Sequence, residues 1–192
     1  YLHNAIYHEK GSRIRIKELG DQFPDTLITA DSYELSEPDK INALYSEMED
    51  EIKELLERAA FDEDTPLVAQ LRQRQEVELL KVPTFLELAK DSCDSQHSVV
   101  LFVSFRQTLE ALSDRLVDDV NGLVTIHGDQ TDEDRAEAIR SFQANEAQVC
   151  VCMIQAGGTG LSLHDEDGGH PRVALISPTF SAVELRQALG RV

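Results

Sequence analysis

From residue 98 onward, short apolar runs alternate with segments of helical periodicity, and this alternation constrains the fold more than any other feature of the chain. The apolar runs, at 98–105, 123–127, 149–154 and 173–177, have the length of buried strands. Between them, amphipathic patterns predict helices at 106–117, 131–142 and 181–190. Strands separated by crossover helices are typical of a parallel sheet covered on both faces. We therefore expect an α/β fold over 98–192.

The residues before position 98 have a helical pattern instead. Ser36, Pro38 and Asp39 form a helix start signal, and apolar residues at spacings of three and four predict a helix to about residue 60. Two further helices are expected at 66–81 and 83–91, and a short strand at 26–30. The sequence thus divides into a connector (1–35), a helical linker or insert (36–97) and an α/β body (98–192).

The net charge of −18 is unevenly distributed, since residues 31–64 hold 13 acidic and 3 basic side chains. This charge argues against a stand-alone nucleic-acid-binding domain. It does not exclude a domain that contacts a few phosphates through backbone amides and hydroxyls. No apolar run approaches the roughly 20 residues of a membrane helix, and no secretory signal is visible. We therefore expect an intracellular protein, cytoplasmic or nuclear, of cellular or viral origin.

Two of the three cysteines, Cys150 and Cys152, lie two residues apart in an apolar run and so face the same side of a strand. Without further ligands at suitable spacing they do not predict a zinc site, and the expected role is that of buried thiols in a reducing compartment. The polar loop 164–170 contains His164 and His170 among acids, but it too has no recognised metal-ligand spacing. We expect no metal site within the chain.

Four sequence motifs occur in the order found in a known family. The run SVVLFVSF at 98–105 resembles helicase motif IV, and Ile126-His127-Gly128 with Thr131 and Arg135 resembles the stretch that follows it. QAGGTGLSL at 155–163 resembles motif V, and Gln187-x-x-Gly190-Arg191 the start of motif VI. Upstream, FPDT and LRQRQEVELLK resemble the family's link from a first lobe. The chain resembles the C-terminal RecA-like lobe of superfamily 2 helicases, most closely the Swi/Snf-type DNA translocases.

The resemblance implies a chemistry divided between two lobes. ATP with Mg²⁺ is then bound mainly by a first lobe, and this chain contains neither a Gly-x-x-x-x-Gly-Lys-Ser/Thr loop nor an Asp-Glu-x-His box. Arg191, with Gln187, would act at the ATP cleft, where Gly160 and Gly190 also lie. The second arginine of motif VI would fall beyond Val192, so we expect a fragment of a larger protein that hydrolyses no ATP alone. The loop between motif V and the last strand is longer and more polar than in the family.

Nucleic acid is the second expected ligand. The resemblance implies backbone contacts from Gly158, Thr159 and Ser162 to one strand of DNA, more readily duplex than single-stranded. Ser104 and Arg106 follow a strand at the sheet edge where ligands of parallel α/β proteins bind. They are expected either to contact a phosphate or to serve as a helix cap and a solvent-exposed arginine, and both interpretations stay open.

Two arginines have a structural interpretation beside the functional one. Arg191 is also consistent with a surface cation placed favourably at a helix carboxyl end. Arg135 lies in the first turn of a helix, an unfavourable place for a cation, and predicts a salt bridge with a nearby acid.

These observations predict the second motor lobe of an ATP-dependent DNA helicase or translocase, with the first RecA-like lobe of the same protein as partner. Two alternatives remain open. One is an RNA helicase lobe, although the Leu161-Ser162-Leu163 ending and the helical insert favour DNA translocases. The other is a non-catalytic helicase-like module that binds other proteins through the acidic helix at 37–60.

Overall fold

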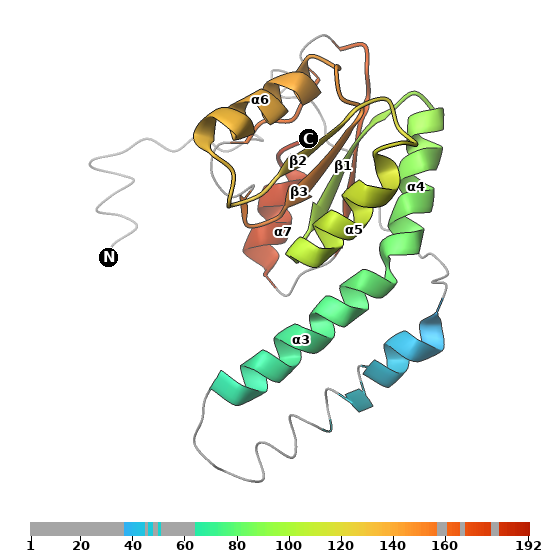
Figure 1. Cartoon of the computed structure of the whole chain (residues 1–192), viewed down its shortest axis with the longest axis vertical. Helices are drawn as coiled ribbons and strands as arrows, with labels where there is room; N and C mark the ends of the chain where they lie inside the picture. Colours follow the sequence, from blue (N-terminus) through green and yellow to red (C-terminus); the bar gives the residue numbers. More distant parts are fainter. Residues whose placement is uncertain are drawn as a thin grey trace, which may run out of the picture. The chain divides into compact units, whose positions relative to one another are not determined.

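The computed structural model describes residues 37–44, 46, 47, 50, 64–156, 161–165, 168–177 and 181–192. They lie within one compact unit, residues 33–192. The helices and strands, shown in Figure 1, are α3 (Asp64–Leu80), α4 (Val82–Asp94), β1 (Ser98–Val103), α5 (Arg106–Leu116), β2 (Leu123–Ile126), α6 (Asp132–Gln143), β3 (Val149–Met153), β4 (Arg172–Ile176) and α7 (Ala182–Leu189).

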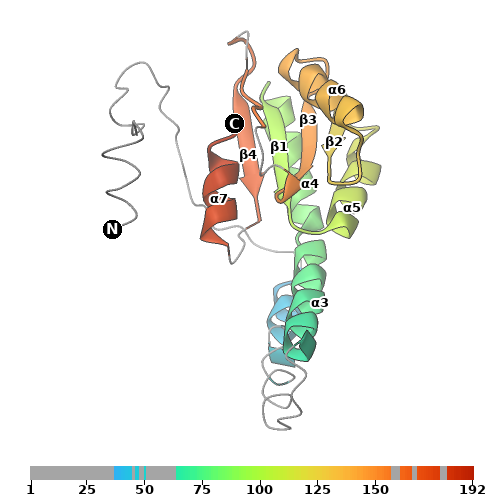
Figure 2. The same cartoon turned by 90° about the vertical axis from the view of Figure 1, so that its left-hand side faces the viewer.

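The four strands form one sheet in the order β2-β3-β1-β4 (Figure 2), and every neighbouring pair is parallel. In the register of this sheet, Val100 of β1 lies opposite Cys150 of β3 and Ala174 of β4. Because the strands run in one direction, their carboxyl ends share one edge of the sheet. The predicted α/β fold with a parallel sheet is confirmed.

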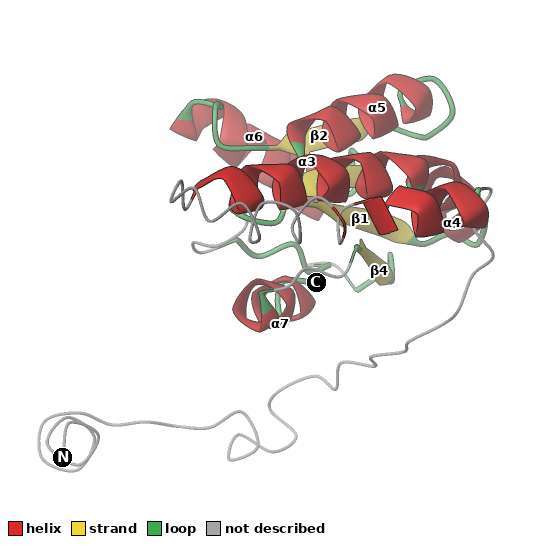
Figure 3. Cartoon of the chain, turned by 90° about the horizontal axis from the view of Figure 1, so that it is seen from below, coloured by secondary structure: helices red, strands yellow, loops and turns green. Residues whose placement is uncertain are grey.

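Helices cover both faces of the sheet. The side chains of Val99, Leu101 and Val103 in β1 pack with α4 and α5, while Val100 and Phe102 pack on the other face with α6 and α7. Figure 3 shows α4 and α7 separated by the strands. All six residues of β1 are buried, which explains why the five that follow Ser98 are all apolar rather than alternating.

The predicted elements agree with the structure apart from their ends. Thr131 and Ser181 cap α6 and α7 by accepting hydrogen bonds from the amides of Asp134 and Glu184, as side chains of this kind do at helix starts. The strand predicted at 98–105 ends at Val103, because the next two residues turn into α5.

The structure tests the prediction for the acidic helix only in part. Residues 38–44 are helical, and so are 46, 47 and 50, whereas the remainder of the predicted helix lies outside the described residues. The connector 1–35 and its predicted strand at 26–30 also lie outside them. Within the described part of the chain, no helix is long and apolar enough to cross a membrane.

Candidate functional site

The carboxyl ends of the parallel strands bring two of the predicted site residues, Ser104 and Arg106, to one edge of the sheet. Ser104 follows β1, His127 follows β2, Ile154 follows β3 and Ser177 follows β4. Ligands of parallel α/β proteins bind at this edge. Gly158, Thr159 and Gly160 follow β3 in the sequence and lie outside the described residues, so their predicted contacts stay predictions.

Arg191 lies directly beside Leu161 and Leu163, in the second half of the motif V stretch. Its guanidinium Nη1 donates to the carbonyl oxygen of Leu161 at 2.9 Å, and its own carbonyl oxygen accepts from the amide of Leu163 at 2.8 Å. These two bonds connect the end of α7, where Gly190 is the C-cap, to the second half of the motif V stretch. Gln187 is exposed on the last turn of α7, and its backbone carbonyl accepts from the amide of Gly190.

Arg135 does not form the predicted salt bridge. Its guanidinium Nη2 donates to the backbone carbonyl oxygen of Ala156, which belongs to the motif V stretch, and no carboxylate of the described residues pairs with it. The carbonyl dipole takes the place of the acid that we expected. Arg135 and Arg191 both act on the thiol of Cys152, but burial outweighs their positive charges and raises its pKa to about 12.

Ser162 is bonded on two sides. Its hydroxyl contacts Nδ1 of His164, and its carbonyl oxygen accepts from the side-chain amide of Gln143 at 3.0 Å. The side chain is partly exposed. A phosphate that takes a hydrogen bond from this hydroxyl therefore has to replace the imidazole contact.

Glu78, on α3, is a residue of this edge that sequence reasoning missed. It is only 4% exposed, and its carboxylate accepts hydrogen bonds from the backbone amides of Ser104 (3.1 Å to each oxygen) and Phe105 (3.1 Å). These amides lie at the amino-terminal end of α5, which favours negative charge. The sequence shows Glu78 as one of two acids that flank Val77, and this pattern does not distinguish it from Glu76.

The Glu78 carboxylate has a direct consequence for the predicted phosphate contacts. The two amides at the start of α5 already hold an anion, so they are not available to a nucleic-acid phosphate. A phosphate contact at the end of β1 must come from the side chains of Ser104 and Arg106.

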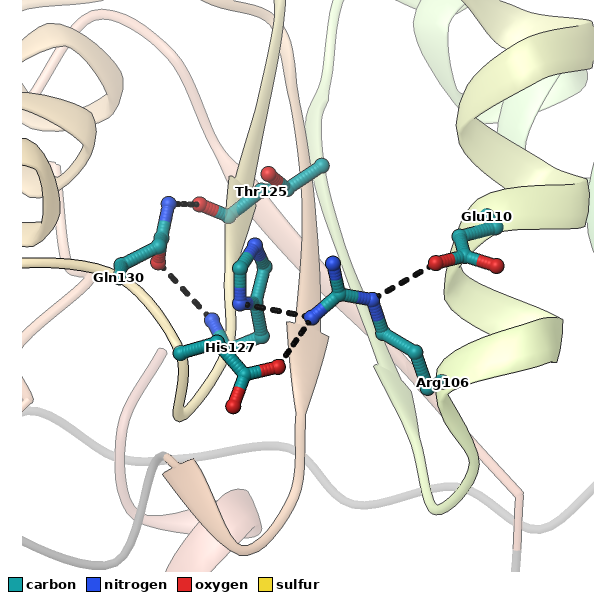
Figure 4. Close-up of polar contacts among 6 residues, drawn as sticks. Arg106, Glu110, Thr125, His127 and Gln130 are labelled. Atoms are coloured by element: carbon teal, nitrogen blue, oxygen red, sulfur yellow. Dashed lines mark hydrogen bonds and ion pairs between the residues drawn. The ribbon is translucent and has the colours of Figure 1, made fainter.

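Arg106 lies at the centre of a polar cluster that joins α5 to the loop after β2 (Figure 4). Its Nε donates to Glu110 Oε1 at 2.9 Å, and its Nη1 donates to Asp129 Oδ2 at 2.8 Å and to His127 Nδ1 at 3.0 Å. The arginine side chain is 42% exposed, so it is a surface residue, yet two carboxylates already contact it. Burial and then the Arg106 charge lower the pKa of His127, which favours the neutral imidazole that accepts this bond.

Gln130 holds the loop after β2 in place. Its side-chain amide donates to the carbonyl oxygen of Thr125 at 2.8 Å, and its side-chain oxygen accepts from the amide of His127 at 2.9 Å (Figure 4). The position of Asp129 is therefore fixed on one side by the Gln130 hydrogen bonds and on the other by the capped start of α6.

A family profile described as helicase conserved C-terminal domain matches residues 78–192. The chain belongs to this family. A protein of Acanthamoeba polyphaga mimivirus, named "Putative ATP-dependent RNA helicase L364", is 42% identical over 183 residues, which are 95% of this chain and 33% of that protein. The helicase lobe thus spans about a third of the length of the curated relative that it matches.

Solved structures are similar to this chain at low sequence identity. The SWI2/SNF2 ATPase C-terminal domain of Sulfolobus solfataricus aligns with a TM-score of 0.53 at 13% identity, covering 79% of this chain and 80% of that one. The C-terminal part of the Fun30 ATPase domain is 24% identical, with a TM-score of 0.49, and covers 58% of this chain and 35% of that one. The first alignment shows the RecA-like fold, and the predicted membership of a superfamily 2 helicase C-terminal lobe is confirmed.

Proposed function

We propose that this helicase lobe is the second motor lobe of an ATP-dependent DNA helicase or translocase and that it supplies Arg191 to the ATP cleft. The observation that carries the proposal is the pair of hydrogen bonds between Arg191 and residues 161 and 163. They link the candidate catalytic cation to the stretch that we assign to nucleic acid. A movement of Arg191 is then transmitted to the motif V stretch through the backbone.

The chemistry of this proposal is charge stabilisation. In phosphoryl transfer, negative charge spreads over the γ-phosphate oxygens, and a positioned arginine lowers the barrier by compensating it. Bound Mg²⁺ would neutralise the β- and γ-phosphate oxygens. The chain has no phosphate loop, and among its described residues no group of three metal-ligating side chains is found, so ATP with Mg²⁺ would be held mainly by the first lobe. Gln187, Gly160 and Gly190 would line the cleft beside Arg191.

Nucleic acid would lie along the edge of the sheet that is formed by the carboxyl ends of the strands. We assign the phosphate contacts to Ser104, Arg106 and Ser162 and to the turn residues Gly158 and Thr159. Duplex DNA is the first choice of substrate, because the Leu-Ser-Leu ending of the motif V stretch and the helices before β1 resemble those of DNA translocases. RNA is the second, because the mimivirus relative bears the name of an RNA helicase.

The longer protein that contains this chain tests the proposal. Arg191→Ala should lower nucleic-acid-stimulated ATP hydrolysis by about 10³-fold or more, with KM for ATP changed far less, because the charge acts mainly in the transition state. Arg186→Ala is the matched control, since Arg186 is an exposed arginine on α7, five residues before Arg191. A variant Arg191→Ala with undiminished turnover would refute the catalytic assignment.

Stimulation of the same protein by duplex DNA, single-stranded DNA and RNA distinguishes the two substrates. The 192-residue chain alone should hydrolyse no ATP. Lack of ATP hydrolysis by the longer protein, together with lack of a phosphate loop in its sequence, would instead support a non-catalytic interaction module.

A further inference from the structure

We propose that Asp129 competes with a nucleic-acid phosphate for Arg106 and so limits how tightly this edge of the sheet holds a nucleic-acid backbone. The inference rests on the proposed function, because it assumes that phosphate binds here. Whereas the proposed function names residues that promote nucleic-acid binding, this inference assigns Asp129 the opposite effect. The argument depends on which nitrogens of the Arg106 guanidinium are already bonded.

The guanidinium of Arg106 has three nitrogens, and two of them are engaged. Glu110 contacts Nε, while Asp129 and His127 contact Nη1. Among the described residues, none bonds to the third nitrogen, Nη2. Glu110 lies one turn along the same helix, so that pair is local to α5, whereas Asp129 reaches Arg106 from a different element.

The strong interaction of arginine with a phosphate is bidentate and uses two neighbouring nitrogens. The Nη1–Nη2 side of Arg106 offers such a pair, but Asp129 contacts Nη1 and places a negative charge where the phosphate would approach. Removal of that carboxylate leaves Nη1 with the His127 contact alone. The imidazole is uncharged and competes with a phosphate much less strongly than a carboxylate does.

The Asp129 carboxylate is suited to being displaced rather than to holding the fold together. Its side chain is 86% exposed, and an ion pair this accessible to water is weak. The loop that carries it is nevertheless fixed by the Gln130 hydrogen bonds, so the carboxylate stays near Arg106 in the free protein. A weak competitor held in place lowers affinity for every nucleic acid without preventing binding.

The test measures binding of short fluorescent duplex DNA, single-stranded DNA and single-stranded RNA to the 192-residue chain by anisotropy, near physiological salt. Asp129→Asn should tighten binding about two- to five-fold, the equivalent of one exposed ion pair. Glu133→Gln is the control, because it removes the same charge from an exposed position in the first turn of α6. Each variant is also made in an Arg106→Gln background.

The expected result is a gain for Asp129→Asn that disappears when Arg106 is absent, whereas any effect of Glu133→Gln persists in that background. Equal gains for Asp129→Asn and Glu133→Gln, or a gain that survives loss of Arg106, would show a general charge effect and overturn the inference. A loss of affinity in a variant that melts like the wild type would also overturn it. Absence of binding in every protein would refute the proposed function at this edge, and the inference with it.

Discussion

The buried carboxylate of Glu78 gives the sharpest quantitative prediction. It accepts hydrogen bonds from the amides of Ser104 and Phe105, and neither amide has another acceptor among the described residues. A hydrogen bond to a charged group contributes roughly 1.5–3 kcal/mol, so losing both costs about 3–6 kcal/mol. Water that enters the site can bond the freed amides and recover part of this loss. Glu78→Ala should therefore lower the free energy of unfolding by about 3 kcal/mol or more.

The geometry predicts a smaller loss of stability for Glu78→Gln, which replaces the carboxylate by a side-chain amide. Oε1 alone accepts from both amides, and the second oxygen adds only a further contact to Ser104. Glu78→Gln can keep one oxygen in that position and lose mainly the charge, so we expect a cost of about 1–2 kcal/mol. Glu76→Ala is the control, because this acid is exposed on the same helix and its loss should stay within about 0.5 kcal/mol.

Urea denaturation followed by circular dichroism measures all three variants, with an unchanged m-value as the sign that the unfolding transition is the same. Hydrogen exchange adds a local measurement, since the amides of Ser104 and Phe105 should lose protection before those of β1 as a whole. If Glu78→Ala unfolds within about 1 kcal/mol of the wild type, or if Glu78→Gln is as costly as Glu78→Ala, the reasoning from these hydrogen bonds is wrong.

Three further predictions concern the thiols, a buried arginine and a histidine. Burial raises the pKa of Cys152 to about 12 and that of Cys150 well above its usual value. A thiol reagent at mildly alkaline pH should therefore modify neither cysteine until the chain is unfolded, and modification in the native state would contradict this prediction. The side chain of Arg172 is only 4% exposed and lies 4.4 Å from the centre of the Phe142 ring, and two of its nitrogens have no hydrogen-bond partner among the described residues. Arg172→Met should cost less stability than Arg172→Ala, and denaturation that reversed this order would refute the prediction. The pKa of His127 is lowered in the folded state, so the unfolded chain takes up this proton first as the pH drops. The free energy of unfolding should therefore fall as the pH decreases from the usual histidine pKa through the folded-state pKa. His127→Asn should flatten this pH dependence, and an unchanged dependence would show that another group causes it.

The sequence predicted the order, type and direction of the elements from β1 to α7, because strand length, helical period and capping residues are local signals. Thr131 and Ser181 cap the helices that their positions predicted. The end of β1 was placed two residues too late, since Phe105, although apolar, lies beyond the last ladder residue and is the N-cap of α5. The salt bridge of Arg135 was wrong, because its partner is a carbonyl 21 positions away that no local pattern reveals.

What the sequence alone determined is therefore the parallel α/β fold, the family and the list of candidate side chains along it. Only the tertiary structure decided how those side chains are used. It showed that the Glu78 carboxylate from α3 already occupies the amides at the start of α5, and that Asp129 and Glu110 share Arg106. The physical reason is that periodicity and capping act over a few residues, whereas hydrogen bonds across a sheet edge join residues 20 or more apart, such as Arg106 and Asp129, which lie 23 positions apart.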